Sequence, residues 1–305
     1  MIKMNNRVYG VVGIKSIMSN WNADFTGRCK TLSDGTIYGS DKAFKYPIKQ
    51  MWKVNNEKVL YAKSYIIEKG INKPKDISER YNEIFDTDLS KEKDEKSIIV
   101  NLFSALDVLN FGATFAVAKP KTNISITGAV QIGQGFNKYD STSIEVQNII
   151  SPFRNKENDE MTTIGNKVVA DEAHYMYPFS VNPSNYDIYT DVYPEFIGYT
   201  KEAYSKFKEA CLVAATSYNT NSKIGCENEF AVFVECKDNS KLYLANLDSY
   251  IEFKKEDEKD IIDITTLMDM LSNHLAEIDN IEIYYNEYTT TLVGANDNCI
   301  IKSLF

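Results

Sequence analysis

The sequence of 305 residues contains no apolar run that reaches the roughly 18–20 residues needed to cross a bilayer. Its N-terminus, MIKMNNRVYGVVGIK, lacks the hydrophobic stretch and the cleavage site of a signal peptide. These two absences argue against a membrane-spanning helix and against secretion. We therefore expect a protein of the cytoplasm that has no membrane partner.

Residues that hold metals or catalyse reactions are scarce. There are two histidines, His174 and His274, and five cysteines with no C-x-x-C pair: Cys29, Cys211, Cys226, Cys236 and Cys299. Free thiols in a reducing compartment explain this pattern better than a zinc site or disulfides. The Gly-rich run at 128–135 lacks the Gly-Lys-Ser/Thr ending of a P-loop, which argues against nucleotide hydrolysis. We predict neither a metal nor a cofactor.

The net charge of −9 is unevenly distributed along the chain. Residues 1–75 contain 14 basic and 5 acidic residues, whereas the remainder contains 20 basic and 38 acidic residues. The basic first quarter can offer phosphate groups a local surface, while the acidic remainder favours solubility. Chance clustering of surface lysines is the alternative interpretation.

Local patterns predict alternating strands and helices. An apolar, β-branched run predicts a buried strand at 7–18, and a polar loop follows at 19–39. A helix is expected at 41–54 with Ser40 as its N-cap, and Pro47 either delays its start or kinks it. Further strands are expected at 58–67, 111–118, 123–132, 230–235, 242–247 and 281–285, and further helices at 200–216, with Thr200 as cap, and at 263–278.

Two segments interrupt this alternation. Residues 68–105 are polar and charged and predict a helical insertion, and residues 137–170 lack a sustained period and predict a protruding hairpin or loop. The chain shows no internal repeat, so we expect a single domain over residues 1–305. The order of the elements is that of an α+β, ferredoxin-like fold, which is also the fold of RNA-recognition domains. A sheet of this kind offers one open face to single-stranded RNA.

Short motifs follow the first predicted strand: Asn20-Trp21-Asn22-Ala23-Asp24, then Thr26-Gly27-Arg28, then Ser40-Asp41 and Lys45. This series resembles the opening of the CRISPR-associated Cas7 family, the backbone subunit of type I systems. In that family a strand leads to an Asn-Pro-Asn-Gly-Asp-like loop, a Gly-Arg pair and a basic helix that opens with Thr-Asp. This sequence departs from the pattern at Trp21, Ala23 and Pro47.

A second series begins at Phe111-Gly112-Ala113 and continues through residues 125–133, 144–147 and 162–169. It resembles the family's Phe-Gly strand, its Thr-Gly-Pro-Val-Gln strand and a hairpin that returns through a Thr-Met-Gly-like turn. Ala129 stands where the family usually has proline. The resemblance covers residues 7–53 and 111–180, and it fits the type I-B branch best.

The resemblance implies a member of the RAMP superfamily that is not an enzyme. Such a subunit has an RRM-like palm, and its copies polymerise along the guide RNA (crRNA) of a Cascade complex. A thumb hairpin, here residues 137–170, kinks the RNA and flips out a base at regular intervals. The implied partners are the crRNA, target DNA paired to it, neighbouring copies of the chain and the other Cascade subunits.

Four lysines are the first candidates for RNA contact: Lys42, Lys45, Lys49 and Lys53. Their spacing of 3, 4 and 4 places them along one face of the expected helix. Such a row can follow a phosphate backbone without reading sequence, as a guide-RNA protein requires. The alternative is a lysine face that only contacts solvent.

The loop after the first strand supplies further candidates. Asn20, Asn22 and Arg28 lie at the expected edge of the palm, and Arg28 could bind a phosphate through two hydrogen bonds. The alternative role is a turn stabilised by the asparagine side chains. Trp21 could stack on a base or anchor the core, and the sequence favours neither.

Two more groups of residues complete the predicted RNA site. Small residues around Gly128, together with Gln131 and Gln134, would allow RNA to approach the backbone, although a strand bend explains them equally well. In the thumb, Arg154 and Lys167 could contact phosphates. The apolar residues Ile149, Ile150, Phe153 and Met161 could unstack bases or form a small hydrophobic cluster.

Two other functions remain open from the sequence. The runner-up is a metal-independent endoribonuclease that processes precursor crRNA, in which His174 acts as acid or base beside Tyr175 and Tyr177. Asp24 is a loop carboxylate like the one that type III relatives use to cut RNA, but the type I resemblance gives it no catalytic role. The third hypothesis is an unrelated α+β protein that binds a small ligand.

Overall fold

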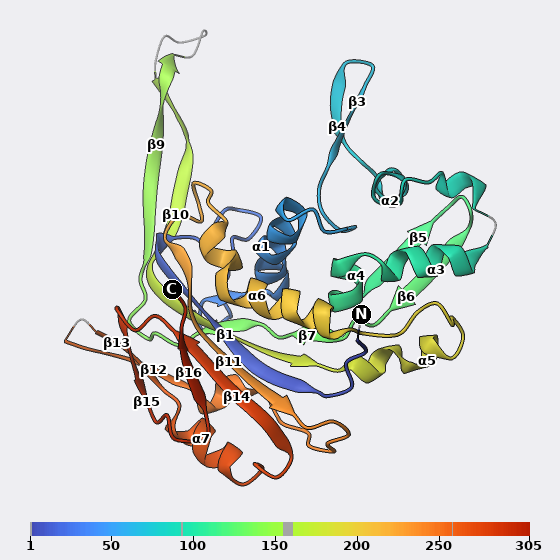
Figure 1. The fold of residues 1–305 in the computed structure, drawn as a ribbon. Helices are drawn as coiled ribbons and strands as arrows, with labels where there is room; N and C mark the ends of the chain where they lie inside the picture. The colour runs from blue at the N-terminus through green and yellow to red at the C-terminus, as the bar shows by residue number, and fades with distance from the viewer. Residues whose placement is uncertain (1, 93, 155–160, 258) are drawn as a thin grey trace.

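A long twisted sheet forms the centre of the computed structural model, which describes residues 2–92, 94–154, 161–257 and 259–305 (Figure 1). Within these ranges, nine strands belong to the sheet, and seven follow the order β16-β14-β11-β1-β10-β8-β2, with β7 and β9 also paired to β10. Their bounds are β1 Val8–Ser19, β2 Tyr38–Gly39, β7 Val130–Ile132, β8 Gly135–Asn137, β9 Ile144–Arg154, β10 Met161–Val181, β11 Cys226–Cys236, β14 Ile278–Tyr285 and β16 Ile300–Ser303.

The middle of the sheet has the predicted ferredoxin-like topology. β1 pairs antiparallel with β10 on one side and with β11 on the other. β7 and β8 pair with the edge of β10 that faces away from β1. If the four strands of the ferredoxin-like unit are numbered along the chain as β1, β7 with β8, β10 and β11, their order across the sheet is 4-1-3-2. The β-branched run of β1 is buried from Val8 to Ile14, which confirms the buried strand expected there.

Helices cover one face of this sheet: α1 (Asp41–Val54), α4 (Leu106–Phe111) and α6 (Lys201–Ser217) (Figure 1). α1 begins where Ser40 Oγ accepts a hydrogen bond from the Ala43 backbone N–H at 3.3 Å, and it runs through Pro47 without a delayed start. α6 begins at its predicted cap, Thr200, whose Oγ1 accepts from the Ala203 N–H at 3.1 Å. Both helices bury their apolar stripes against the sheet.

The opposite face of the sheet is covered as well. A three-stranded sheet of β12 (Glu252–Glu256), β13 (Lys259–Asp263) and β15 (Thr290–Val293) packs there with α7 (Thr265–Ser272) and the short helix η3 (Leu247–Tyr250). We call these elements the C-terminal layer. Val11 and Val232 of the central sheet pack against Leu267 and Leu271 of α7 in one core. The expectation of an open RNA-binding face is therefore wrong for the central strands.

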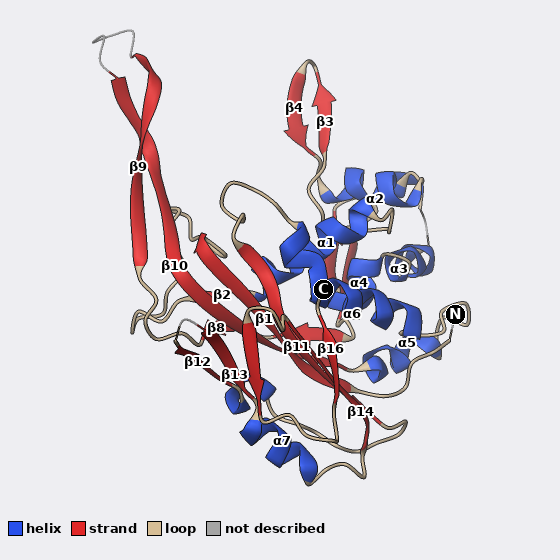
Figure 2. Ribbon diagram, turned by 60° about the vertical axis from the view of Figure 1, so that its left-hand side comes forward, coloured by secondary structure: helices blue, strands red, loops and turns tan. Residues whose placement is uncertain are grey.

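Two hairpins project from the same side of the molecule (Figures 1 and 2). One consists of β9 and residues 161–170 of β10, and we call it the thumb. The other consists of β3 (Tyr65–Glu68) and β4 (Ile71–Pro74). The strand predicted at 58–67 overlaps β3, whereas β4 lies in the segment that was expected to be a helical insertion. The elements that follow β4 along the chain, apart from α4, are α2 (Ile77–Phe85), η1 (Leu89–Lys91), α3 (Glu95–Phe103), β5 (Ala113–Val117) and β6 (Thr122–Ile126). Two short helices, η2 (Pro183–Tyr186) and α5 (Asp187–Thr190), precede α6.

Several predicted elements differ from the structure. The strand expected at 123–132 is divided between β6 and β7, which belong to different sheets, and the helical insertion expected at 68–105 begins with the β3–β4 hairpin. Residues 58–64 are not a strand, because the Asp107 carboxylate accepts the backbone N–H groups of Leu60 and Tyr61, both at 2.8 Å. Residues 242–246 of the strand expected at 242–247 form a loop, in which Leu242 and Leu244 pack on the C-terminal layer, and Leu247 begins η3. The helix expected at 263–278 ends at Ser272, and Ile278 already begins β14.

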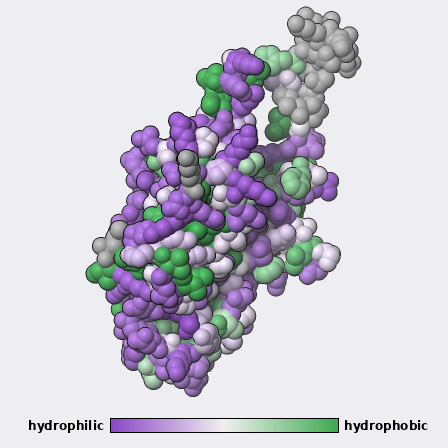
Figure 3. Space-filling model, turned by 90° about the vertical axis from the view of Figure 1, so that its right-hand side faces the viewer, coloured by the Kyte–Doolittle hydropathy of each residue, from purple (hydrophilic) through white to green (hydrophobic). Residues whose placement is uncertain are grey.

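The surface seen from the side of α3 is mostly hydrophilic, with hydrophobic side chains in separate small patches (Figure 3). Within the described residues, no helix combines the length and hydropathy needed for a membrane span. The larger exposed apolar side chains include those of the two hairpins, such as Ile67 and Phe153, each 77% exposed.

Candidate nucleic-acid interface

The loop that follows β1 is fixed by its two asparagines. Asn20 Nδ2 donates to the carbonyl oxygens of Gly27 at 3.2 Å and of Val168, in the thumb strand, at 3.0 Å. Asn22 Oδ1 accepts the Ser40 backbone N–H at 2.8 Å. The turn-stabilising role considered for these residues is thus present, and it joins the loop to the base of the thumb and to the start of α1.

Trp21 lies in the core between these asparagines. It is 1% exposed, and its indole N–H donates to the Tyr177 hydroxyl at 2.6 Å. Of the two roles left open by the sequence, the structure shows the core anchor, because a buried ring cannot stack on a base.

A tight turn carries Asp24 and Arg28. Asp24 Oδ1 accepts the backbone N–H groups of Thr26 at 2.8 Å and Arg28 at 3.0 Å, and also the Thr26 hydroxyl at 2.8 Å. The hydrogen bond from the Thr26 hydroxyl is the main cause of a lowered pKa at Asp24. Asp24 therefore holds the turn together, while Arg28 and the neighbouring Phe25 lie exposed to solvent.

The lysine row of α1 is split between two environments. The Lys42 side chain is 88% exposed, and Lys53 is also exposed. Lys45 is half-buried, with Nζ 3.0 Å from Asp41 Oδ2. Lys49 is also half-buried, and desolvation lowers its pKa although Asp107 attracts the charge. Lys42 and Lys53 thus present their ammonium groups to solvent, and the two middle lysines face the protein.

The predicted Gly-rich contact does not join this surface. Gly128 is buried, and a Cβ there would lie 2.2 Å from the Gly112 nitrogen, so the packing of the chain requires a glycine at this position. Gln131 is exposed and pairs with Ser180 in the sheet. Its neighbours Val130 and Ile132 belong to the core on the face that α1 covers. Because side chains alternate along a strand, Gln131 points to the opposite face. Gln134 is exposed between β7 and β8.

Two adjoining cavities lie where the loop after β1, the first turns of α1 and the base of the thumb meet. Their volumes are about 530 and 490 Å³, and Ala23, Tyr46 and Lys223 line both. The first is also lined by Asn22, Phe25, Lys30 and Lys42, and the second by Asn20, Ile149, Lys167 and Tyr218. We call the two together the thumb-base groove. It brings together four of the predicted residues, Asn20, Asn22, Lys42 and Lys167, from three separate parts of the chain.

Lys223 is one of the residues of this groove that the sequence did not indicate. Its ammonium donates to the carbonyl oxygens of Asn20, at 2.7 Å, and of Trp21. Burial lowers its pKa. Beside it, the rings of Tyr46 and Tyr218 meet edge to face with centroids 5.3 Å apart. No motif marks Lys223 or Tyr218, because they reach the groove only through the fold.

The thumb presents apolar side chains to solvent. Ile149 is 42%, Ile150 64% and Phe153 77% exposed, so they do not form the hydrophobic cluster that was the alternative. The side chains of Arg154 and Met161, also predicted to contact RNA, lie outside the described part of the structure. Lys167 Nζ lies 3.5 Å from Asn221 Oδ1 at the thumb base.

The family model for CRISPR-associated protein Cas7 matches residues 6–270. The chain belongs to the Cas7 family. Among solved structures, it is similar to a chain of a "CRISPR RNA-guided surveillance complex, pre-nicking" at 12% identity and a TM-score of 0.51, covering 97% of this chain and 96% of that one. A chain of a "CRISPR RNA-guided surveillance complex" matches at 14% identity and a TM-score of 0.48, with coverage of 92% and 91%. No curated protein matches the sequence.

The histidine considered for RNA cleavage is buried in this Cas7 chain. His174 is 0% exposed, and Tyr175 and Tyr177 are buried beside it. A general acid or base must lie within hydrogen-bond reach of the reacting atoms. The endoribonuclease hypothesis therefore has no accessible acid–base pair at the residues that were proposed for it.

Proposed function

We propose that this Cas7 chain is a non-catalytic subunit that binds crRNA and polymerises along the spacer, forming the backbone of a Cascade surveillance complex in antiviral defence. Through the crRNA it would serve the recognition of target DNA. We place it in the type I-B branch and in the cytoplasm, with neighbouring copies and other Cascade subunits as protein partners.

The observation that carries this proposal is the thumb-base groove. It is lined by four lysines, Lys30, Lys42, Lys167 and Lys223, and by the tyrosines Tyr46 and Tyr218. Ammonium groups bind phosphates without reading bases, and aromatic rings accept any base by stacking. Both properties suit a protein whose guide sequence changes from one spacer to the next.

The name of one structurally similar chain supports the same assignment. The chain from the "CRISPR RNA-guided surveillance complex, pre-nicking" shares the fold over nearly its whole length. The buried position of His174 supports a binding role over the processing of precursor crRNA.

The direct test is co-expression of the chain with an RNA that contains one repeat and one spacer. We expect an RNA-containing assembly of several copies on gel filtration, with RNA of the length of the guide recovered from it. The double variant Lys30→Glu/Lys42→Glu should lose this assembly, whereas Lys254→Glu, on the exposed surface of the C-terminal layer, should keep it. Purification of the native chain as an RNA-free monomer under these conditions would contradict the proposal.

A further inference from the structure

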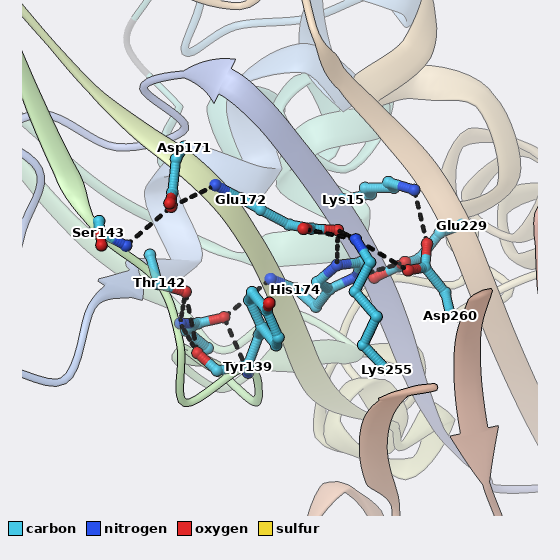
Figure 4. Close-up of polar contacts among 11 residues, drawn as sticks. Lys15, Tyr139, Thr142, Ser143, Asp171, Glu172, His174, Glu229, Lys255 and Asp260 are labelled. Atoms are coloured by element: carbon cyan, nitrogen blue, oxygen red, sulfur yellow. Dashed lines mark hydrogen bonds and ion pairs between the residues drawn. The ribbon is translucent and has the colours of Figure 1, made fainter. Parts of the chain in front are cut away.

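A cluster of charged side chains lies between the central sheet and the C-terminal layer (Figure 4). It joins five strands through six residues: Lys15 of β1, Glu172 and His174 of β10, Glu229 of β11, Lys255 of β12 and Asp260 of β13. His174, Glu229 and Asp260 are each at most 2% exposed. We call these six residues the ionic latch.

The imidazole of His174 is held on both ring nitrogens. Nδ1 lies 2.7 Å from Glu229 Oε2, and Nε2 lies 3.3 Å from Glu172 Oε1. Because each carboxylate accepts and neither donates when ionised, the two contacts together require a proton on both ring nitrogens, which is the charged form of the imidazole. The Phe253 ring stacks on the imidazole with centroids 3.7 Å apart, and Tyr139 meets it edge-on, which keeps water away.

The charges of the latch balance only when His174 is protonated. Three carboxylates face two ammonium groups: Lys15 lies 2.6 Å from Asp260, and Lys255 lies 2.6 Å from Glu172 and 3.7 Å from Asp260. Burial alone would lower the pKa of His174, but Glu229, Asp260 and Glu172 outweigh it and raise the pKa above its usual value. The phenol of Tyr139 is the remaining titratable group that faces the ring.

Three of these residues also have the spacing of a metal site. Donor atoms of Glu172, His174 and Asp260 lie within 4.8 Å of one another. The ammonium of Lys255, however, lies 2.6 Å from both oxygens of Glu172, where a bound cation would have to sit. The chain thus supplies its own cation at this point.

The latch lies where the thumb leaves the sheet. β10 pairs with β1 as far as Ala170, opposite Ser19, and from Ala170 outward it pairs with β9. Glu172 and His174 are the second and fourth residues after this junction. Lys255 of the C-terminal layer pairs with Glu172, and Phe253 of the same strand stacks on His174. The base of the thumb is therefore tied to elements that do not touch the thumb-base groove.

We propose that the ionic latch positions the thumb, with His174 as a positioning residue: its protonated ring joins Glu172 of β10 to Glu229 of β11 beneath Phe253 of the C-terminal layer. Loss of the ring proton leaves three buried carboxylates with two cations. The contact between Glu229 and Glu172 through the ring is then broken, and the thumb base loosens. The effect on RNA assembly rests on the proposed function, but the effect on the thumb does not.

The thumb can be followed with two nitroxide labels, at Phe153→Cys in the thumb and at Val54→Cys at the end of α1. Both residues are exposed, and four of the five natural cysteines are buried, so replacing Cys299 by serine leaves a clean background. We expect a narrow distance distribution at about pH 6 that broadens as the pH rises to about 9.5, because the His174 proton is lost above its raised pKa. Assembly on guide RNA should weaken over the same range.

Matched variants separate the latch from general pH effects. His174→Gln should give the broad distribution at every pH, whereas His274→Gln, at the other histidine of the chain, should behave as the native protein. Glu229→Gln removes one carboxylate and should shift the transition to lower pH by about one unit, which tests the latch even if His174→Gln does not fold.

Three outcomes would overturn the proposal: a distance distribution that does not change with pH, a native-like transition in both latch variants, or tight binding of one Zn²⁺ per chain in calorimetric titration. The thumb could follow the predicted pH profile although the chain binds no guide RNA. This result would support the ionic latch and contradict the proposed function.

Discussion

β1 and β9 are both antiparallel neighbours of β10, but their side chains occupy opposite environments. β1 is buried on both faces from Val8 to Ile14, whereas β9 is exposed on both faces from Ile144 to Ile150. The two strands therefore share backbone pairing and differ in packing. Since a hairpin of two strands alone is marginally stable in water, the thumb needs a partner surface that β1 does not need. Under the proposed function, we expect the central sheet to supply the stability of the fold and the thumb to act in assembly.

Removal of the thumb is the strongest test of that division. Replacing residues 142–163 by a short Gly-Ser linker should leave a folded monomer, because none of the described side chains at 142–153 belongs to either core. The same protein should fail to assemble on guide RNA, since burial of each exposed apolar side chain against RNA or a neighbouring copy is worth about 1.5–3 kcal/mol. Circular dichroism and gel filtration with RNA measure the two effects.

Either of two results would break the comparison. Unfolding of the shortened chain would show that the thumb belongs to the core. Assemblies of normal length and spacing would show that the thumb is not needed for polymerisation.

One substitution made in both regions should give a smaller but sharper contrast. Phe233 in β11 is 0% exposed and packs 5.5 Å from the Phe179 ring, whereas Phe153 in the thumb is 77% exposed. Phe233→Ala should lower the free energy of unfolding by about 3–5 kcal/mol, because it leaves a cavity. Phe153→Ala should change it by less than about 0.5 kcal/mol. Urea unfolding of both variants decides this, and equal losses would remove the distinction.

The elements that the sequence predicted well are those with local signals. β1, α1 and α6 follow from a β-branched run and from caps at Ser40 and Thr200, which act within one turn of the chain. The strand predicted at 58–67 is wrong for residues 58–64, and the cause is distant in sequence: the carboxylate that accepts the Leu60 and Tyr61 backbone N–H groups belongs to Asp107. Neither the hydrophobic periodicity nor the composition of this segment indicates a hydrogen-bond partner so far along the chain.

The candidate site divides in the same way. The loop motif and the lysine row brought Asn20, Asn22 and Lys42 into consideration, and the structure places all three at the thumb-base groove. Lys223 and Tyr218 could not be found, because they come from a loop beyond α6 that contacts the groove only in the folded chain. Burial also distinguishes the two roles that the sequence left open for Trp21, because its ring lies in the core.

The two environments of the lysine row allow a test within one helix. Lys49 is half-buried and faces Asp107, so Lys49→Glu would place two carboxylates near each other and should destabilise the fold by about 2 kcal/mol. Lys53→Glu, one turn further and exposed, should leave the stability within about 0.5 kcal/mol. Thermal or urea unfolding measures both, and equal stability of the two variants would mean that Lys49 is as free as Lys53.

The smallest expected effect concerns a single phosphate contact. Lys42 is 88% exposed at the mouth of the groove, and its nearest carboxylate, Asp41, lies 3.7 Å away, so Lys42→Gln should leave the free energy of unfolding unchanged. If the Lys42 ammonium binds a phosphate, the variant releases one counterion fewer when it binds RNA. The magnitude of the slope of log affinity against log salt concentration should then decrease by about 0.7 for single-stranded RNA. The change should be the same for guides of different spacer sequence, because a phosphate contact carries no base information. Lys254→Gln in the C-terminal layer should keep the native slope. A lower affinity with an unchanged slope, or a loss that depends on the spacer sequence, would show that Lys42 acts on the bases or on the fold, and the groove would then lose its role as a sequence-independent phosphate site.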